Sequence, residues 1–198
     1  MKVIFCIPGR EFSGNFLKSW SKLINELHSM KIEWELINLY MPIVYKARQK
    51  CLEKALKVTG EYDYIMWIDS DIIFEPHDFK QLLSHKLDIV SGLYLCQKNN
   101  GIYDIPQEYA CVDLNGKRFN RFEYEGTRQL KEVRANGMGW MLVKQGVFET
   151  IRYPFYSNEK LGTMGEDIVF QLKAKEHGFK SLVDTSVIVG HEKTYILR

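Results

Sequence analysis

A short apolar run followed by two closely spaced aspartates, in the segment YIMWIDSDIIF at residues 64–74, constrains this chain most. A short apolar segment bounded by charge is typical of a buried strand. In open α/β sheets, ligands bind at the carboxyl ends of such strands. Asp69 and Asp71 repel each other there and favour a cation, and Mg²⁺ or Mn²⁺ prefers oxygen ligands. The segment therefore predicts a metal ion and a phosphate-containing ligand at this point.

Strand and helix signals alternate through residues 1–95. Ser13-Gly14-Asn15 and Pro76 are typical helix starts, and Gly60 is a typical helix end. This alternation predicts an α/β fold with a mostly parallel sheet covered by helices. Apolar stretches predict strands at residues 3–7, 32–40, 64–68 and 89–94, and apolar periodicity predicts helices at residues 13–27, 47–58 and 76–83.

Residues 96–198 follow a different pattern. Residues 97–107 carry loop signals, and Asn115-Gly116 predicts a hairpin that joins strands at 109–114 and 118–124. Further strands are expected at 140–143, 181–183 and 187–189, with a helix at 167–177 that Gly178 ends. No linker or repeat separates the two halves, so we expect one domain over residues 1–198.

The composition narrows the class of protein. The 198 residues are 45% hydrophobic and carry a net charge of +2, which does not favour nucleic acid as a partner. The four cysteines have no C-x-x-C spacing and lie mainly in apolar surroundings, so we expect buried thiols in a reducing compartment. The sequence shows neither a signal peptide nor a membrane-spanning run, which predicts a soluble, cytoplasmic protein.

Two further segments carry residues suited to chemistry, and each has an ordinary structural interpretation. Glu166 and Asp167 follow Gly165 at a helix start, where the helix dipole alone stabilises carboxylates and where a functional carboxylate could equally be held. His191 follows a strand and a glycine; it is either a polar loop residue or a third ligand for Mn²⁺ beside the two aspartates.

Glycine and arginine provide two weaker signals. Gly137 and Gly139 precede Trp140 at the start of a predicted strand, where glycine permits either close approach to a ligand or simply a turn. Arg48 lies on a predicted helix whose opposite face is apolar, so it is a solvated arginine unless a negative group lies near it.

Taken together and in this order, these segments resemble the metal-dependent, D-x-D-containing glycosyltransferases of the GT-A type, in their compact soluble bacterial and viral form. The resemblance runs over nearly the whole chain and implies a GT-A, Rossmann-like mixed sheet flanked by helices. It implies that residues 1–95 bind a sugar nucleotide and that residues 96–198 serve the acceptor and catalysis. On this basis the nucleotide-sugar contacts are expected at Pro8, Gly9, Arg10, Arg48, Asp69, Ser70, Asp71, Gly137, Gly139 and Trp140.

The resemblance also implies the metal ligands and the chemistry. Mn²⁺ or Mg²⁺ is expected at Asp69, Asp71 and His191, with Asp71 as a direct ligand and Asp69 touching the ribose or a metal-bound water. The implied activity is hexosyltransferase-type transfer of a sugar from a UDP-sugar to a hydroxyl of a glycan or another acceptor. Asp167 is then the base of an inverting reaction and Glu166 orients the acceptor or the sugar. In a retaining reaction, a carboxylate would instead stabilise an oxocarbenium-like centre.

Three other functions, two enzymatic and one non-catalytic, compete with this interpretation. A phosphatase or phosphotransferase of the haloacid-dehalogenase type also places D-x-D after an apolar strand, but on its first strand and usually with Thr or Val where Ile73 stands here. A sugar-nucleotide-forming nucleotidyltransferase would have a longer glycine-rich loop after the first strand. A non-catalytic carbohydrate-binding module would use aromatic platforms without an ordered set of carboxylates.

Overall fold

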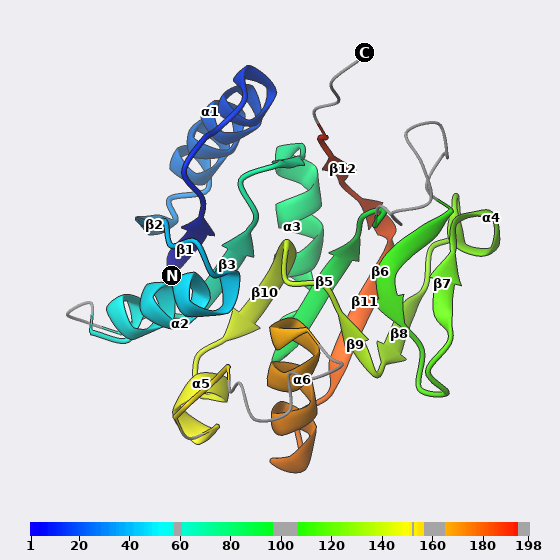
Figure 1. Ribbon diagram of the computed structural model, residues 1–198. Coiled ribbons are helices and arrows are strands. Elements are labelled where there is room, and N and C mark those ends of the chain that lie inside the picture. The colour runs from blue at the N-terminus through cyan, green and yellow to red at the C-terminus, as the bar shows by residue number, and fades with distance from the viewer. Residues whose placement is uncertain (58–60, 97–106, 152, 157–164, 194–198) are drawn as a thin grey trace.

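The computed structural model describes residues 1–57, 61–96, 107–151, 153–156 and 165–193 (Figure 1). Its main sheet has, within these residues, seven strands in the order β2-β1-β3-β10-β5-β11-β8. β10 is antiparallel to both of its neighbours and β8 is antiparallel to β11, whereas the other pairs are parallel. The strands are β1 (Lys2–Pro8), β2 (Glu33–Leu39), β3 (Tyr64–Ile68), β5 (Ile89–Leu93), β8 (Leu130–Val133), β10 (Trp140–Lys144) and β11 (Ser181–Ile188).

Helices cover both faces of the sheet. One face packs against α1 and α3, and the other against α2, α5 and α6. No helix among the described residues is long and apolar enough to cross a membrane. The helices are α1 (Gly14–Ser29), α2 (Val44–Ala55), α3 (Pro76–Ser84), α4 (Arg121–Tyr124), α5 (Val147–Thr150) and α6 (Glu166–Glu176).

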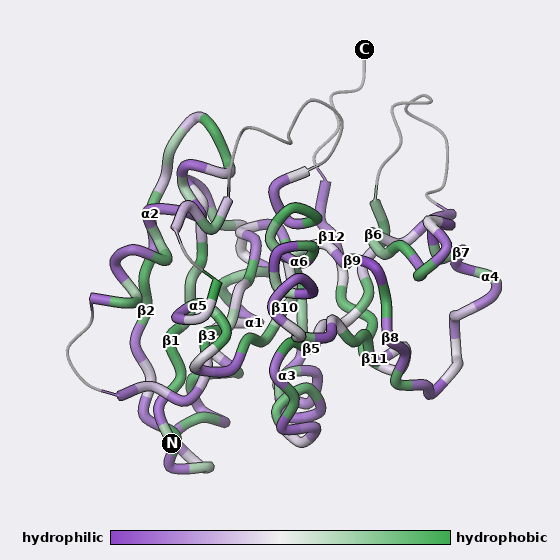
Figure 2. Tube along the Cα trace, turned by 90° about the horizontal axis from the view of Figure 1, so that it is seen from below, coloured by the Kyte–Doolittle hydropathy of each residue, from purple (hydrophilic) through white to green (hydrophobic). Residues whose placement is uncertain are grey.

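The central strands are apolar on both faces because both faces are covered. In β3, Met66 and Ile68 join the core under α1 and α3, whereas Ile65 and Trp67 join the core under α2, α5 and α6. The strands accordingly form the apolar interior of the hydropathy trace (Figure 2). β2 lies at the sheet edge, and of its predicted apolar residues only Ile37 is buried; Trp34 and Leu36 are 37% and 43% exposed.

The predicted helix starts are confirmed. The Ser13 hydroxyl accepts a hydrogen bond from the Phe16 N–H and caps α1. Pro76 opens α3 behind a capping box formed by Glu75 and Asp78. Gly178, with φ of +87°, follows the end of α6 as predicted. The predicted helix at residues 47–58 begins and ends earlier than expected, because α2 runs from Val44 to Ala55 with Leu56 as its C-cap. Residues 58–60 and most of the predicted loop at 97–107 lie outside the described residues.

The second half differs from the sequence prediction in two places, the end of the hairpin and the late strands. The hairpin has strands β6 (Glu108–Val112) and β7 (Arg118–Asn120), and the expected continuation to residue 124 is wrong. The Asn120 side chain accepts a hydrogen bond from the Phe122 N–H and starts α4 instead. The two expected late strands are one strand, β11, with a register shift in its middle.

Small strands complete the fold. β6 pairs with β7 and with β9 (Ala135–Asn136) in a separate sheet. β4 (Ile72–Ile73), directly after the two aspartates, pairs antiparallel with β12 (Gly190–His191) near the end of the described chain. The pairing of β4 with β12 brings His191 opposite Ile72, and it determines the position of the site described next.

Candidate metal and nucleotide-sugar site

The two aspartates lie at the carboxyl end of β3, in a turn between β3 and β4. The Asp69 N–H donates to the Gly139 carbonyl at 3.0 Å, and the Asp69 carbonyl accepts from the Ile72 N–H at 3.1 Å. Asp69, Ser70 and Asp71 are half-buried. The turn is therefore attached to the neighbouring strand β10, and its two carboxylates take up different environments.

The Asp71 carboxylate meets a histidine and a lysine from the end of the described chain. Its Oδ2 lies 3.2 Å from Nε2 of His191 and 2.6 Å from Nζ of Lys193. The Asp71 side chain is 39% exposed. Burial alone would raise the pKa of the Asp71 carboxyl, but the hydrogen bonds from His191 and Lys193 lower it to about 2. Asp71 is therefore an ionised, accessible carboxylate.

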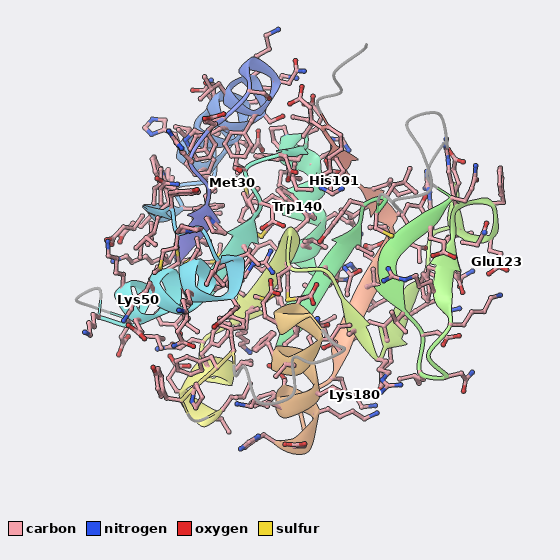
Figure 3. All side chains as sticks on the ribbon, viewed as in Figure 1. Met30, Lys50, Glu123, Trp140, Lys180 and His191 are labelled. Atoms are coloured by element: carbon pink, nitrogen blue, oxygen red, sulfur yellow. The ribbon has the colours of Figure 1, made fainter. Side chains whose placement is uncertain are left out.

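A backbone carbonyl fixes the orientation of the His191 imidazole. Its Nδ1 lies 2.7 Å from the Leu95 carbonyl, so Nδ1 carries a proton and donates. Nε2 is directed toward Asp71, to which it either donates a second N–H or, without that proton, presents a lone pair suited to a metal ion. The ring also packs edge-on against Tyr94. In Figure 3, His191 and Trp140 lie toward the same end of the sheet.

The pair formed by Asp71 and His191 fits two neighbouring ligands of a divalent ion. Ligands at 2.0–2.1 Å and 90° to each other on an octahedral ion are about 3.0 Å apart, close to the 3.2 Å between Oδ2 and Nε2. No group of three histidine, cysteine or carboxylate side chains that could hold a metal is present among the residues described. An ion held here would therefore need further ligands from its substrate and from water.

Asp69, the other aspartate of the expected metal site, is turned toward an arginine instead. Nη2 of Arg48 lies 2.7 Å from Oδ1 and 2.9 Å from Oδ2 of Asp69. Nη1 of the same guanidinium lies 2.7 Å from Oε1 of Glu166. In this conformation Arg48 occupies both oxygens of Asp69, which is why that carboxylate does not join Asp71 and His191.

Arg48 is almost completely buried, with its side chain 5% exposed, so the solvated interpretation is wrong. Burial works against its charge, but the attraction of Asp69 and Glu166 outweighs burial and raises the pKa of Arg48 above its usual range. One buried guanidinium thus joins the turn after β3 to the first residue of α6.

Asp167, the expected base, follows at the start of α6. Its Oδ1 accepts a hydrogen bond from the Ile168 N–H at 2.8 Å. Burial raises the pKa of the Asp167 carboxyl, and the nearby Arg48 charge opposes this rise without cancelling it. Glu166, expected to orient an acceptor or sugar, is engaged by Arg48 in this structure.

Glycines allow the surrounding segments to approach the aspartates. A Cβ on Gly9 would lie 2.4 Å from Cβ of Ser70, so only glycine permits the end of β1 to lie against this turn. A Cβ on Gly139 would lie 3.0 Å from both Oδ2 of Asp69 and the Tyr94 ring. The Tyr94 hydroxyl in turn accepts a hydrogen bond from the Gly139 N–H at 3.1 Å.

The remaining expected contacts fall into different environments. Pro8 is buried at the end of β1, and Arg10 is exposed with its guanidinium over the Tyr40 ring. Gly137 lies against Tyr94 and Ala110. Trp140 is fully buried and packs against Phe74, so its side chain belongs to the core in this structure.

Two contributors to the site were not recognised in the sequence. Lys193 contacts Asp71, and Tyr94 supports Gly139 from the end of β5. For Lys193, the only indication in the sequence was that it stands two residues after His191. Tyr94 resembled an ordinary strand residue, because an aromatic residue at the end of an apolar run is most often core.

The sequence matches no protein-family model and no curated protein. The fold, however, is similar to that of solved structures. A197 from STIV is 18% identical, with a TM-score of 0.61 over 100% of this chain and 97% of that chain. GalNAc-T7, solved with UDP, GalNAc and Mn²⁺, is 12% identical, with a TM-score of 0.62 over 98% of this chain and 43% of its own.

The catalytic domain of Drosophila β1,4-galactosyltransferase 7, solved with xylobiose, is 15% identical. Its TM-score is 0.57, and the similarity covers 98% of this chain and 71% of that chain. At such identities the similarity concerns the fold. The mixed sheet, its flanking helices and these neighbours show that the chain has the fold of the GT-A glycosyltransferases.

Proposed function

We propose that this chain is a metal-dependent glycosyltransferase that moves a sugar from a nucleotide-diphosphate sugar, with UDP as the expected nucleotide, to a hydroxyl of a glycan or another acceptor. The observation that carries the proposal is the 3.2 Å approach of Asp71 and His191 at the carboxyl end of β3. Structural neighbours were solved with UDP, sugars and manganese, which supports the same chemistry for this chain.

Asp71 and His191 would hold Mn²⁺ or Mg²⁺, with the nucleotide diphosphate supplying further oxygens. When bound, such an ion neutralises the charge that develops on the leaving diphosphate. His191 has its Nδ1 anchored on Leu95, so its Nε2 faces Asp71, where it would serve as a ligand once it carries no proton. Lys193 would have to leave Asp71 for this carboxylate to hold a divalent ion, because two cations at one carboxylate oxygen repel each other.

Asp167 would take the proton from the acceptor hydroxyl in an inverting reaction. Its raised pKa brings it closer to the range in which a carboxylate accepts a proton effectively near neutral pH. Arg48 holds Glu166 next to it and links both residues to the aspartate turn. Gly9, Gly137 and Gly139 would contribute by letting neighbouring segments pack directly against Ser70, Asp69 and Tyr94, which holds these side chains in place for the donor.

Thermal unfolding with UDP, GDP or a simple phosphate ester, each with and without Mn²⁺, tests the proposal. A ligand present at about 100 times its Kd stabilises by about 2.7 kcal/mol. We expect stabilisation by UDP that requires Mn²⁺. The His191→Ala variant should lose this effect, whereas His177→Ala, at the other end of α6 from Asp167, should keep it.

Other results of the same experiment would reject the transferase. Stabilisation by the phosphate ester with Mn²⁺, without a response to nucleotides, would indicate a phosphatase. A response to free glycans alone would indicate a carbohydrate-binding module. UDP binding that is the same with and without Mn²⁺ would remove the metal role from Asp71 and His191.

A further inference from the structure

A cavity of about 260 Å³ opens beside Asp167. It is enclosed by the start of α6, by β9 and by the hairpin of β6 and β7. In Figure 1, β9 runs between α6 (orange) and this hairpin (green). A second cavity of about 180 Å³ shares Val112, Ala135 and Ile168 with the first and continues to the β6–β7 turn. Together they form one groove that begins at Asp167.

Two arginines line this groove, Arg118 in the first cavity and Arg134 in the second. The Arg118 side chain is 45% exposed. Its Nε lies 3.8 Å from a Glu108 oxygen, beyond hydrogen-bond distance, and its Nη1 lies 3.4 Å from the Cys96 sulfur. A guanidinium has five N–H donors, so the described residues engage only part of the hydrogen-bonding capacity of Arg118.

Arg134 is half-buried, and its guanidinium makes no hydrogen bond or ion pair with any described residue. Its Nη1 lies 3.6 Å from the position that a Cβ on Gly116 would occupy. Gly116, with φ of +90°, therefore leaves the space beside this guanidinium open. Since no described residue pairs with this guanidinium, it is open to a ligand that offers paired oxygens.

Apart from Asp167, the rest of the wall is apolar or uncharged. Ala110, Val112, Ala135 and Ile168 offer surface for the C–H face of a sugar ring, and Asp167 provides a carboxylate at the inner end. The first cavity has room for roughly eight waters at about 30 Å³ each, which suits a single sugar ring. The guanidinium groups of Arg118 and Arg134 along the path suit carboxylate or phosphate oxygens, which such groups bind in pairs.

We propose that this groove binds the acceptor and that the acceptor is an anionic saccharide, carrying a carboxylate or a phosphate group that Arg118 and Arg134 recognise. This inference rests on the proposed function, because it takes Asp167 as the group that meets the acceptor hydroxyl. It goes further by naming the class of acceptor and two residues that select it.

A larger cavity of about 570 Å³ beside α3 does not offer the same chemistry. Its buried carboxylate, Asp184, already accepts hydrogen bonds from Gln81, Ser186 and His85. The lining of this larger cavity includes the exposed Arg128, which provides a control residue. Arg128→Gln removes the same charge as a groove variant without touching the groove.

Binding measured by NMR titration tests the proposal with three probes: a disaccharide ending in glucuronic acid, the matched disaccharide ending in glucose, and glucose 6-phosphate. We expect an anionic probe to bind at least about tenfold more tightly than the neutral disaccharide, because a charged, bidentate contact contributes about 1.5–3 kcal/mol. Arg118→Gln and Arg134→Gln should each remove most of this preference, and Arg128→Gln should retain it. Tighter binding of the uronic acid assigns a carboxylate, and tighter binding of the sugar phosphate assigns a phosphate.

The assignment fails if the acidic and neutral probes bind equally, if none of the three binds, or if the groove variants behave like Arg128→Gln. Thermal unfolding of the same samples with UDP and Mn²⁺ separates this failure from a failure of the proposed function. Stabilisation by UDP without discrimination among saccharides overturns the groove alone. Anion-dependent saccharide binding without a UDP response keeps the groove as a saccharide site and rejects the transferase.

Discussion

Asp69 and Asp71 are two residues apart, yet they belong to clusters of opposite character. Asp69 lies in a closed cluster, where the nearly buried Arg48 bridges it to Glu166 across two elements of the fold. Asp71 lies in an open cluster with His191 and Lys193, and its own side chain is 39% exposed. The closed cluster joins elements that are distant in sequence, whereas the open one presents an ionised carboxylate that an entering cation can reach.

The two aspartates of this short motif therefore serve different purposes, one structural and one in ligand binding. A buried arginine with two carboxylate partners resists rearrangement, because removal of either side leaves a charge without a partner. A half-exposed carboxylate held by a lysine can exchange that partner for a metal ion at little cost. We therefore expect changes in the closed cluster to affect mainly stability, and changes in the open cluster to affect mainly ligand binding and turnover.

The largest expected effect is on turnover in the open cluster. Asp71→Asn should lower Mn²⁺-dependent release of UDP from the donor by about 1,000-fold, comparable to the loss of one strong electrostatic contact in a transition state, while the melting temperature changes little. Steady-state turnover and thermal unfolding measure the two quantities. Glu123→Gln, which removes a carboxylate paired with Lys117 on the surface, is the control. Full turnover in Asp71→Asn would remove the metal role of this residue.

The next effect is on stability in the closed cluster. Arg48→Met should lower the free energy of unfolding by about 3 kcal/mol, because it leaves Asp69 and Glu166 without their cation. We expect the low end of the range for buried pairs, since the Asp69 side chain is 26% exposed. Urea unfolding measures it. Lys50→Met, on the exposed face of the same helix, should change stability by less than about 0.5 kcal/mol. Equal losses in both variants would contradict the contrast between the clusters.

A smaller effect should appear in metal affinity without nucleotide. Lys193→Ala removes the ammonium that lies 2.6 Å from the Asp71 oxygen. Two charges about 4 Å apart in water interact by about 1 kcal/mol, so Mn²⁺ should bind about fivefold more tightly. Isothermal titration calorimetry measures this, with Lys180→Ala, whose lysine pairs with Glu132 on the surface, as the control. Weaker Mn²⁺ binding in Lys193→Ala would show that the lysine does not compete for the carboxylate.

The smallest effect concerns the pH dependence of stability at Asp167. The fold raises the pKa of this carboxyl above its ordinary value of 3.8, so the folded protein holds the proton more tightly than the unfolded chain. The stabilisation of the folded state by protonated Asp167 is therefore complete below pH 3.8 and is lost as pH rises through the pKa of Asp167 in the folded protein. Asp167→Asn should be slightly more stable than the native protein at pH 7, by about 0.5 kcal/mol, and should transfer no sugar. Unfolding at pH 4 and pH 7 tests the sign: a variant less stable at pH 7 would contradict it.

Much of the first half of the fold could be predicted because its signals are local. Ser13 and Pro76 start helices through contacts within one turn, and the apolar run before Asp69 forms a strand whatever lies beside it. The second half was predicted less well. β11 contains the polar residues Asp184 and Thr185, which suggest a break, yet both are buried and hydrogen-bonded to distant side chains.

The sequence by itself determined that two carboxylates stand at the carboxyl end of a buried strand, with a second carboxylate pair and a histidine farther along the chain. Only the tertiary structure decided which of them meet. Arg48 reaches Asp69 and Glu166 because α2 and the start of α6 lie on the same face of the sheet. His191 reaches Asp71 because β12 pairs with β4. Such contacts depend on how distant segments cross in space, and no local pattern of side chains encodes that crossing.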